Sequence, residues 1–132
     1  MLFLLDTNIC IYVINERPAA VLAQFLAHEE DGLAISAITA SELYWGVGKT
    51  GSKRNLQALE KFLAPLTIMD FDLDAAKAYG ELRALLERKG TPIGPLDTQI
   101  AAHALALDLT LVTNNVREFN RVPRLRIENW AA

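Results

Sequence analysis

The sequence of 132 residues contains a single cysteine, Cys10, so it lacks the second thiol that an internal disulfide would need. The same scarcity excludes a zinc site built from cysteines, and the apolar neighbours of Cys10 predict that it lies in the core. Positive charge is scarce as well, because the net charge is −3 and the isoelectric point is about 5.3. This balance argues against nucleic-acid binding through bulk positive charge, although it leaves room for a local basic patch.

Long hydrophobic runs are missing too. No stretch is long enough to cross a bilayer, and no basic segment followed by a long apolar run indicates a signal peptide. We therefore expect a cytoplasmic protein without a membrane partner. Repeats, low-complexity tracts and linkers are also absent, whereas 52% of the residues are hydrophobic and 22% are charged. This composition predicts a folded protein with one domain over residues 1–132.

Short apolar runs alternate with helical segments along the whole chain. The expected strands are 2–5, 33–36, 66–69 and 109–112, with a short edge strand at 125–127. The expected helices are 8–15, 19–28, 38–47, 53–63, 72–89 and 96–107. This alternation predicts the α/β class, as a three-layer α/β/α fold with a central, mostly parallel sheet of four or five strands.

Polar residues follow the expected strands, where right-handed crossovers bring the carboxyl ends to one edge of the sheet. Asp6 follows the first strand, and Thr113, Asn114 and Asn115 follow the fourth. Glu42 and Asp97 lie in the early turns of two later helices. Ligands of such folds bind outside this edge, so these side chains are expected to converge there.

Each of these polar residues also has a structural interpretation. Asp6 could cap the next helix, the dipole favours Asp97 at a helix start, and Asn114-Asn115 is an ordinary turn pair. Glu42 is harder to explain in this way. It shares a helical face with apolar neighbours, and no lysine or arginine lies three or four residues away to pair with it.

Three carboxylates at one edge repel each other unless a cation joins them. Oxygen ligands without cysteine or a histidine pair suit a hard ion, Mg²⁺ or Mn²⁺. Such an ion commonly works on phosphates, so the residues predict metal-assisted hydrolysis of a phosphodiester. Carboxylate clusters of this kind also serve phosphatases and phosphate-binding switches.

Four segments together resemble the PIN-domain ribonucleases, and most closely VapC, the toxin of bacterial VapBC toxin–antitoxin pairs. The segments are "LLDTNICIYVI", "SAITASELYWG", "GTPIGPLDTQIAAHAL" and "LTLVTNNVREFNRVPRLRIENW". They cover nearly the whole chain and keep the order and spacing of the family. The resemblance implies a PIN-like parallel sheet flanked by helices and a metal-dependent endoribonuclease that acts as a type II toxin.

The resemblance also assigns roles to residues. Asp6, Glu42 and Asp97 match the three family acids, which hold Mg²⁺ or Mn²⁺, with Glu42 acting directly or through water. Asn115 stands where many PIN domains have a fourth acid, so we expect it in the catalytic site. Because an amide brings no negative charge, this departure weakens the case for a second metal ion.

Supporting roles are predicted for residues beside these positions. Thr7 resembles the family hydroxyl next to the first acid, where it could hold Asp6 or a substrate phosphate. Basic residues cluster after the segments that carry the acids, as phosphate contacts would. The supporting and substrate-binding set is Thr7, Asn8, Thr113, Arg83, Arg88 and Arg117. Tyr44 and Trp45 are expected in the core, with RNA stacking or antitoxin contact as the alternative.

The expected partners follow from the resemblance alone. The first is an RNA substrate, expected to be a transfer RNA cut in the anticodon loop of initiator tRNA. The second is a VapB-type antitoxin that blocks the site. The third is a second copy of the chain in a homodimer. The apolar helices between residues 19 and 63 are the candidates for the protein contacts.

Two alternative functions remain open from the residues. A haloacid-dehalogenase-like phosphatase also places an aspartate after the first strand. It would require a second aspartate at the position where this chain has Asn8. A non-catalytic PIN relative would be expected to have lost one of the three acids, and all three are present. A dinucleotide-binding domain is excluded because no glycine-rich loop follows the first strand.

Overall fold

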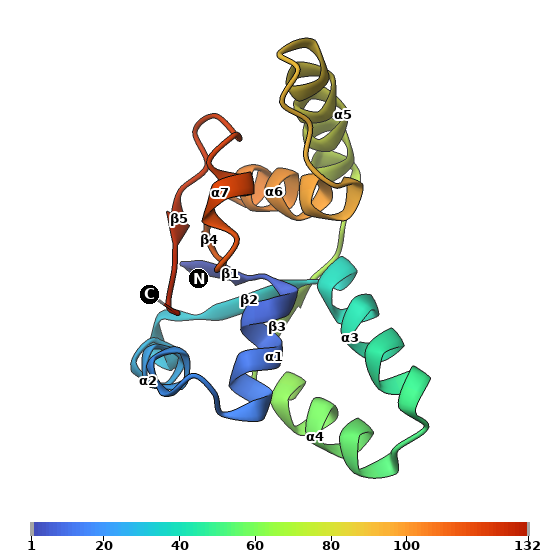
Figure 1. The fold of residues 1–132 in the computed structure, drawn as a ribbon, viewed down its shortest axis with the longest axis vertical. Helices are drawn as coiled ribbons and strands as arrows, with labels where there is room; N and C mark the ends of the chain where they lie inside the picture. The colour runs from blue at the N-terminus through green and yellow to red at the C-terminus, as the bar shows by residue number, and fades with distance from the viewer. Residues whose placement is uncertain (1, 132) are drawn as a thin grey trace.

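The central sheet runs through the middle of the molecule (Figure 1), in a computed structural model that describes residues 2–131. Its strand order is β3-β2-β1-β4-β5, and every neighbouring pair is parallel. The strands are β1 (Phe3–Leu5), β2 (Leu33–Ser36), β3 (Thr67–Met69), β4 (Thr110–Val112) and β5 (Ile127–Glu128). The α/β class and the parallel sheet are thus confirmed.

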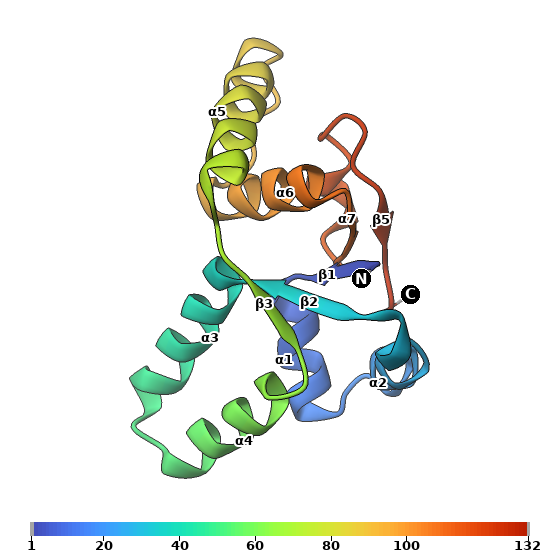
Figure 2. The same cartoon turned by 180° about the vertical axis from the view of Figure 1, so that it is seen from behind.

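Helices cover both faces of the sheet, which is the three-layer arrangement that the sequence predicts. Figures 1 and 2 show α1 to α4 on one side and α5 to α7 on the other. The helices are α1 (Thr7–Asn15), α2 (Ala19–Ala27), α3 (Ala37–Thr50), α4 (Lys53–Leu63), α5 (Leu73–Arg88), α6 (Pro95–Leu107) and α7 (Val116–Phe119), with a 3₁₀ turn, η1 (Glu29–Asp31). Among the described residues, no single helix is long and apolar enough to cross a membrane.

The strand residues alternate between the two faces, as the two-residue period of a strand requires. The face toward α1 to α4 carries Phe3, Leu5, Leu33, Ile35 and Val112. The face toward α5 to α7 carries Leu4, Ala34 and Leu111. The three central strands, β1, β2 and β4, are therefore apolar on both sides, which is why the sequence shows short continuous apolar runs there instead of an alternating pattern.

Short polar residues start several of the helices. Asp6, Ser36 and Asp72 are the N-caps of α1, α3 and α5, and their side chains accept hydrogen bonds from Ile9, Ile38 and Ala75 N–H groups. Because Asp6 directly follows β1 and Ser36 is the last residue of β2, these strands turn into helices without an intervening loop. This arrangement fixes the first turns of α1 and α3 at the carboxyl edge of the sheet.

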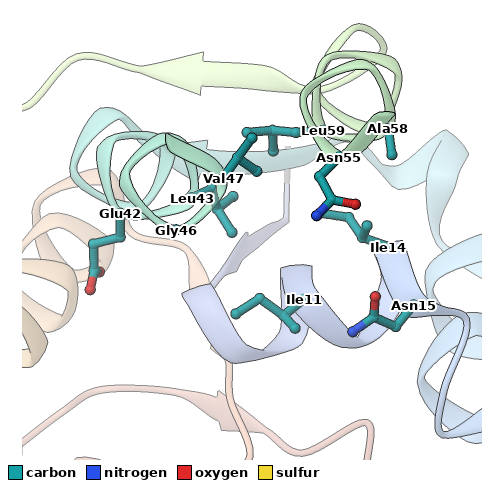
Figure 3. A pocket seen from close by; sticks show the side chains of 10 residues that line it. All are labelled: Ile11, Ile14, Asn15, Glu42, Leu43, Gly46, Val47, Asn55, Ala58 and Leu59. Carbon is teal, nitrogen blue, oxygen red and sulfur yellow. The ribbon is translucent and has the colours of Figure 1, made fainter. Parts of the chain in front are cut away.

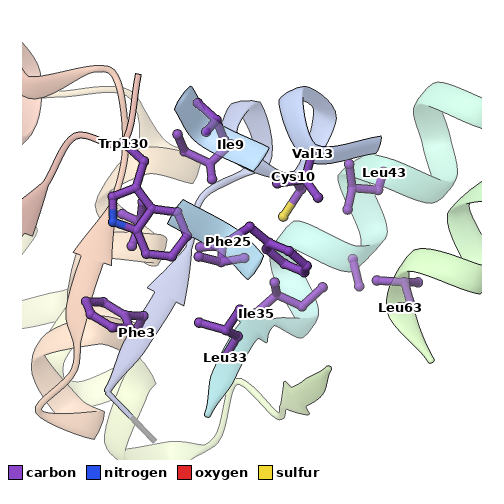
Figure 4. Packing of buried hydrophobic residues seen from close by; sticks show 14 of the residues in the cluster. Phe3, Ile9, Cys10, Val13, Phe25, Leu33, Ile35, Leu43, Leu63 and Trp130 are labelled. Atoms are coloured by element: carbon purple, nitrogen blue, oxygen red, sulfur yellow. The ribbon is translucent and has the colours of Figure 1, made fainter. Parts of the chain in front are cut away.

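A cluster of aromatic side chains covers one end of the core, near the C-terminal end of the described chain (Figure 4). Trp130 is 4% exposed and packs edge-on against Phe3, with ring centroids 5.5 Å apart. His28 stacks on the Trp130 indole at 5.4 Å. The chain that follows β5 is thereby fastened against β1 and the end of α2.

The core prediction is wrong for two aromatic residues of α3. Tyr44 is 43% exposed and Trp45 is 66% exposed. Both lie in the C-terminal half of α3, which faces α1 and α4 through other residues, Gly46 and Val47. Helical spacing alone could not show which faces of this half a neighbouring element covers. Cys10, in contrast, is fully buried as predicted.

Replacing Trp130 with alanine should lower the free energy of unfolding by about 3 kcal/mol or more, because it removes a buried indole and leaves a cavity. The matched control is Trp45→Ala, whose exposed ring should cost less than about 1 kcal/mol. Urea denaturation followed by circular dichroism measures both. Equal losses in the two variants would contradict the packing described here.

Candidate active site

The acidic residues meet where the strand order reverses. From β1 the chain continues to β2 on one side of the sheet, whereas β4 lies on the other side of β1. The carboxyl ends of β1 and β4 therefore border a crevice, which is where open parallel sheets bind ligands. A pocket of about 180 Å³ lies there, lined by Asp6, Thr7, Asn8, Glu42, Asp97, Ile100, Asn115 and Phe119.

Asp6 forms the floor of this pocket and is only 7% exposed. One of its carboxylate oxygens accepts a hydrogen bond of 2.9 Å from the Ile9 N–H, which caps α1. Burial raises the pKa of Asp6, and the negative charge of Glu42 raises it further, while hydrogen bonds from the Thr113 side chain and Ile9 lower it. The same carboxylate therefore starts a helix and carries a buried charge at the site.

Thr113 connects the two strand ends beneath the pocket. Its side chain is fully buried and hydrogen-bonds Asp6, and its Oγ1 accepts a hydrogen bond of 3.0 Å from the Asn115 N–H. Thr113 thus holds the turn after β4 against the end of β1. Its supporting role at the site stays a prediction.

Glu42 reaches the pocket from the second turn of α3. The Thr7 hydroxyl donates a hydrogen bond of 2.9 Å to Glu42 Oε1. This contact joins the first residue of α1 to α3 and fixes the orientation of the carboxylate. Thr7 therefore contacts the second acid, whereas the sequence suggested Asp6 or a substrate phosphate as its partner.

Asp97 lies in the first turn of α6, and its environment discourages ionisation. Its pKa is raised to about 6 by burial, then by a hydrogen bond and the charge of Glu118, and then by the charges of Asp6 and Glu42. A carboxyl group that titrates near neutrality beside three other acids is a sign of a functional site. Without a cation, Asp97 is therefore harder to ionise than an ordinary aspartate.

Glu118 is the site residue that the sequence interpretation missed. It lies in α7 and accepts a hydrogen bond of 3.1 Å at Oε2 from the Asn115 side-chain amide. Asn115 is the N-cap of α7 and Glu118 is three residues later, the spacing of a helix capping box. That spacing was visible in the sequence and could have indicated that Glu118 lies beside Asn115.

The donor set fits a hard divalent cation. Asp6, Glu42, Asp97 and Glu118 offer only carboxylate oxygens, and Asn115 adds an amide. Within the described residues, no three acidic, histidine or cysteine side chains stand close enough to form a ready set of ligands. Mg²⁺ suits such an open arrangement, because it keeps several waters and takes only one or two carboxylates directly.

The predicted basic residues are spread over three places. Arg117 is exposed on α7, next to the acidic pocket. Arg83 borders the start of α6, but its guanidinium donates to the Tyr79 hydroxyl at 2.8 Å and pairs with Glu87 at 3.4 Å. Arg88 lies on a different surface, beside Leu105 and Pro123. Within residues 2–131, none of the three lines the acidic pocket itself, and contacts of these residues with RNA stay predictions.

Comparison with known proteins shows similarity over nearly the whole chain. The family model for the PIN domain matches residues 3–125. The chain is 45% identical over 129 residues to the tRNA(fMet)-specific endonuclease VapC of Salmonella typhimurium, covering 97% of each chain. It is 46% identical over 132 residues to ribonuclease VapC2 of Rickettsia felis, covering 98% of each.

Solved structures have the same fold. The VapBC2 complex of Rickettsia felis bound to a promoter DNA fragment contains a chain with a TM-score of 0.90 and 44% identity, covering 98% of this chain and 99% of that one. A chain of the DNA-bound VapBC complex of Salmonella typhimurium also gives 0.90, at 46% identity and the same coverage. The chain therefore belongs to the PIN-domain family and, within it, to the VapC ribonucleases.

The double role of Asp6 can be separated by substitution. Asparagine is also a good N-cap, so Asp6→Asn should keep α1 capped and remove a buried charge, whereas Asp6→Ala should be about 1 kcal/mol less stable than Asp6→Asn. Urea denaturation of both metal-free variants at pH 8 measures the difference. Identical stabilities would show that the Ile9 contact contributes nothing.

The raised pKa of Asp97 makes the metal-free protein sensitive to pH. A raised pKa favours the folded state below the ordinary carboxyl pKa, and this advantage is lost as the pH rises from about 4 to about 6. Asp97→Asn should therefore be more stable than the wild type at pH 8, by on the order of 1 kcal/mol after allowing for solvent screening at a half-buried site.

Thermal melts of both proteins with a metal chelator, at pH 4 and pH 8, test this expectation. Glu118→Gln is the matched second variant, because it removes the neighbour that contributes most to the shift after burial. It should reproduce part of the gain at pH 8. A wild type that is more stable than Asp97→Asn at pH 8 without metal would contradict the account.

Proposed function

We propose that this chain is a metal-dependent endoribonuclease, the toxin of a type II toxin–antitoxin pair, which hydrolyses RNA phosphodiester bonds with Mg²⁺ or Mn²⁺. The observation that carries the proposal is the set of converging carboxylates, where burial and the neighbouring acids together raise the pKa of Asp97 to about 6. The proposed organisation is one PIN domain over residues 1–132, and the proposed location is the cytoplasm.

The acids that line the pocket would have different roles. Asp6 and Asp97 would hold the cation, and Glu42, oriented by Thr7, would act directly or through a water molecule. When bound, the cation polarises a phosphoryl oxygen, lowers the pKa of an attacking water and stabilises the leaving oxygen. Asn115 and Thr113 would keep the α7 side of the pocket in place.

Asp97 would also give up a proton. Its pKa is raised in the metal-free site, so binding of the cation near pH 6 would release part of a proton from it. With the cation bound, a site carboxylate beside the attacking water would accept the proton of that water. Water attack in line would leave a 5′-phosphate and a 3′-hydroxyl, and the ribose 2′-hydroxyl would not act as the nucleophile.

The proposed substrate is a transfer RNA, with the anticodon loop of initiator tRNA as the expected target. This choice rests on the relative of Salmonella typhimurium, which is named a tRNA(fMet)-specific endonuclease. Single-stranded loops suit an open pocket, because their bases and phosphates are accessible. Asn8, Arg83, Arg88 and Arg117 remain the proposed contacts to RNA.

An apolar pocket beside the acidic site is the proposed binding site for a VapB-type antitoxin (Figure 3). Its volume is about 300 Å³, and it lies between α1, α3 and α4. The apolar lining consists of Ile11, Ile14, Leu43, Val47, Ala58 and Leu59. Glu42 borders both this pocket and the acidic one, so a bound peptide could place a cation against the acids. A homodimer is the proposed assembly.

Cleavage of total bacterial RNA by the antitoxin-free protein with Mg²⁺ tests the proposal, with sequencing of the new 5′ ends. Discrete cuts should appear for the wild type and disappear in Asp6→Asn and Asp97→Asn, each of which removes one charge without changing side-chain shape. Glu30→Gln is the matched control, because Glu30 is an exposed acid away from the pocket. It should cut like the wild type.

Two results would contradict the proposal. Products that carry a 2′,3′-cyclic phosphate would show that the ribose hydroxyl is the nucleophile. Folded wild-type protein that cuts no RNA with Mg²⁺ or Mn²⁺ would favour a non-catalytic RNA-binding or protein-binding PIN domain.

A further inference from the structure

The most exposed large aromatic side chain of the described residues carries a cation on its ring. Trp45 is 66% exposed on α3. The Lys49 Nζ atom lies over the indole, 3.7 Å from the ring centroid. A lysine held on the face of this indole places positive charge beside an exposed aromatic ring in an otherwise acidic protein.

This pair lies on the same side of α3 as Glu42. With 3.6 residues per turn, Trp45 and Lys49 point within about 60° and about 20° of the direction of Glu42. Trp45 is one turn, about 5 Å, beyond the site acid along the helix, and Lys49 is about 10 Å beyond it. The pair therefore extends the acidic pocket along α3.

We infer that Trp45 and Lys49 form a binding site for the single-stranded RNA segment next to the scissile phosphate, where Trp45 stacks on a base and Lys49 contacts a phosphate. This inference rests on the proposed function. The indole has two faces, and Lys49 covers one of them. The other face offers the flat apolar surface on which unpaired bases stack.

The charge distribution explains why such a site is needed. The cleft itself contains Asp6, Glu42, Asp97 and Glu118, which repel RNA phosphates wherever no cation neutralises them. Arg83 is engaged with Tyr79 and Glu87, and Arg88 lies on another surface. Lys49 makes no ion pair in the described structure and is a cation directly in line with the cleft.

The remaining faces of α3 separate this site from the protein contacts. Leu43 and Val47 point to the apolar pocket between α1, α3 and α4. Tyr44 points about 160° away from Glu42 and lines an apolar recess with Leu56 and Lys53. Tyr44 is therefore a matched control, since it is an exposed aromatic on the same helix that does not face the cleft.

Intrinsic fluorescence gives a direct measurement, because the chain has two tryptophans and Trp130 is buried. The probe is a short single-stranded oligouridylate, titrated into the full-length Asp6→Asn protein so that it is not cut. Binding should quench the emission of Trp45 by stacking. An RNA duplex of the same length, whose bases are already stacked, should not quench it.

Substitutions separate the two parts of the site. By fluorescence anisotropy with labelled oligouridylate, Trp45→Ala should bind about tenfold more weakly, and Trp45→Phe should recover part of the loss. Lys49→Gln should lower the slope of log affinity against log salt by about 0.7, the value of one phosphate contact on a single strand. Tyr44→Ala should bind like the parent protein. In cleavage assays, Trp45→Ala should raise KM and leave kcat unchanged.

Specific results would overturn the inference. If the wild type cuts RNA, while oligouridylate binds without quenching and Trp45→Ala keeps its KM, Trp45 is outside the RNA path and the proposed function still stands. A Trp45→Ala variant that retains its RNA affinity but forms monomers in sedimentation, or fails to hold its antitoxin, would assign the face to a protein partner. Absence of both cutting and RNA binding by the wild type would reject the proposed function together with this site.

Discussion

The repulsion between carboxylates at one edge of a parallel sheet is the constraint on which the rest of the site depends. Asp6, Glu42, Asp97 and Glu118 come from four separate segments, and among the described residues no lysine or arginine lines the pocket between them. Burial and the neighbouring acids raise the pKa of Asp97 to about 6, so the metal-free site disfavours its charged form. A divalent cation would relieve the repulsion, so binding of the metal and stability of the site are coupled.

The surrounding structure holds these charges in place through short polar contacts. Thr7 orients Glu42, Thr113 ties the turn after β4 to Asp6, and the Asn115 amide contacts Glu118. Each contact joins residues from different elements, except the last, which lies within α7. Because the strands end at the pocket and α1 and α3 begin there without a loop, the geometry of the acids is set by the core of the fold.

The sequence predicts the sheet and three of the four acids for physical reasons. Continuous apolar runs indicate buried parallel strands, and polar residues directly after them indicate the ligand-binding edge. Glu118 was missed because α7 is a single short turn, although its spacing from Asn115 matched a capping box. Trp45 was placed in the core because helical periodicity does not show which faces of α3 a neighbouring element covers. The exposed indole became visible only in three dimensions.

Titration of Mn²⁺ into the metal-free protein at pH 6, by calorimetry in buffers of different ionisation enthalpy, tests the central claim most directly. The account predicts that binding releases a fraction of a proton, that this release vanishes at pH 8, and that Glu118→Gln reduces it. Binding that releases no proton at pH 6, or that persists unchanged in Asp97→Asn, would contradict a cation held by these carboxylates.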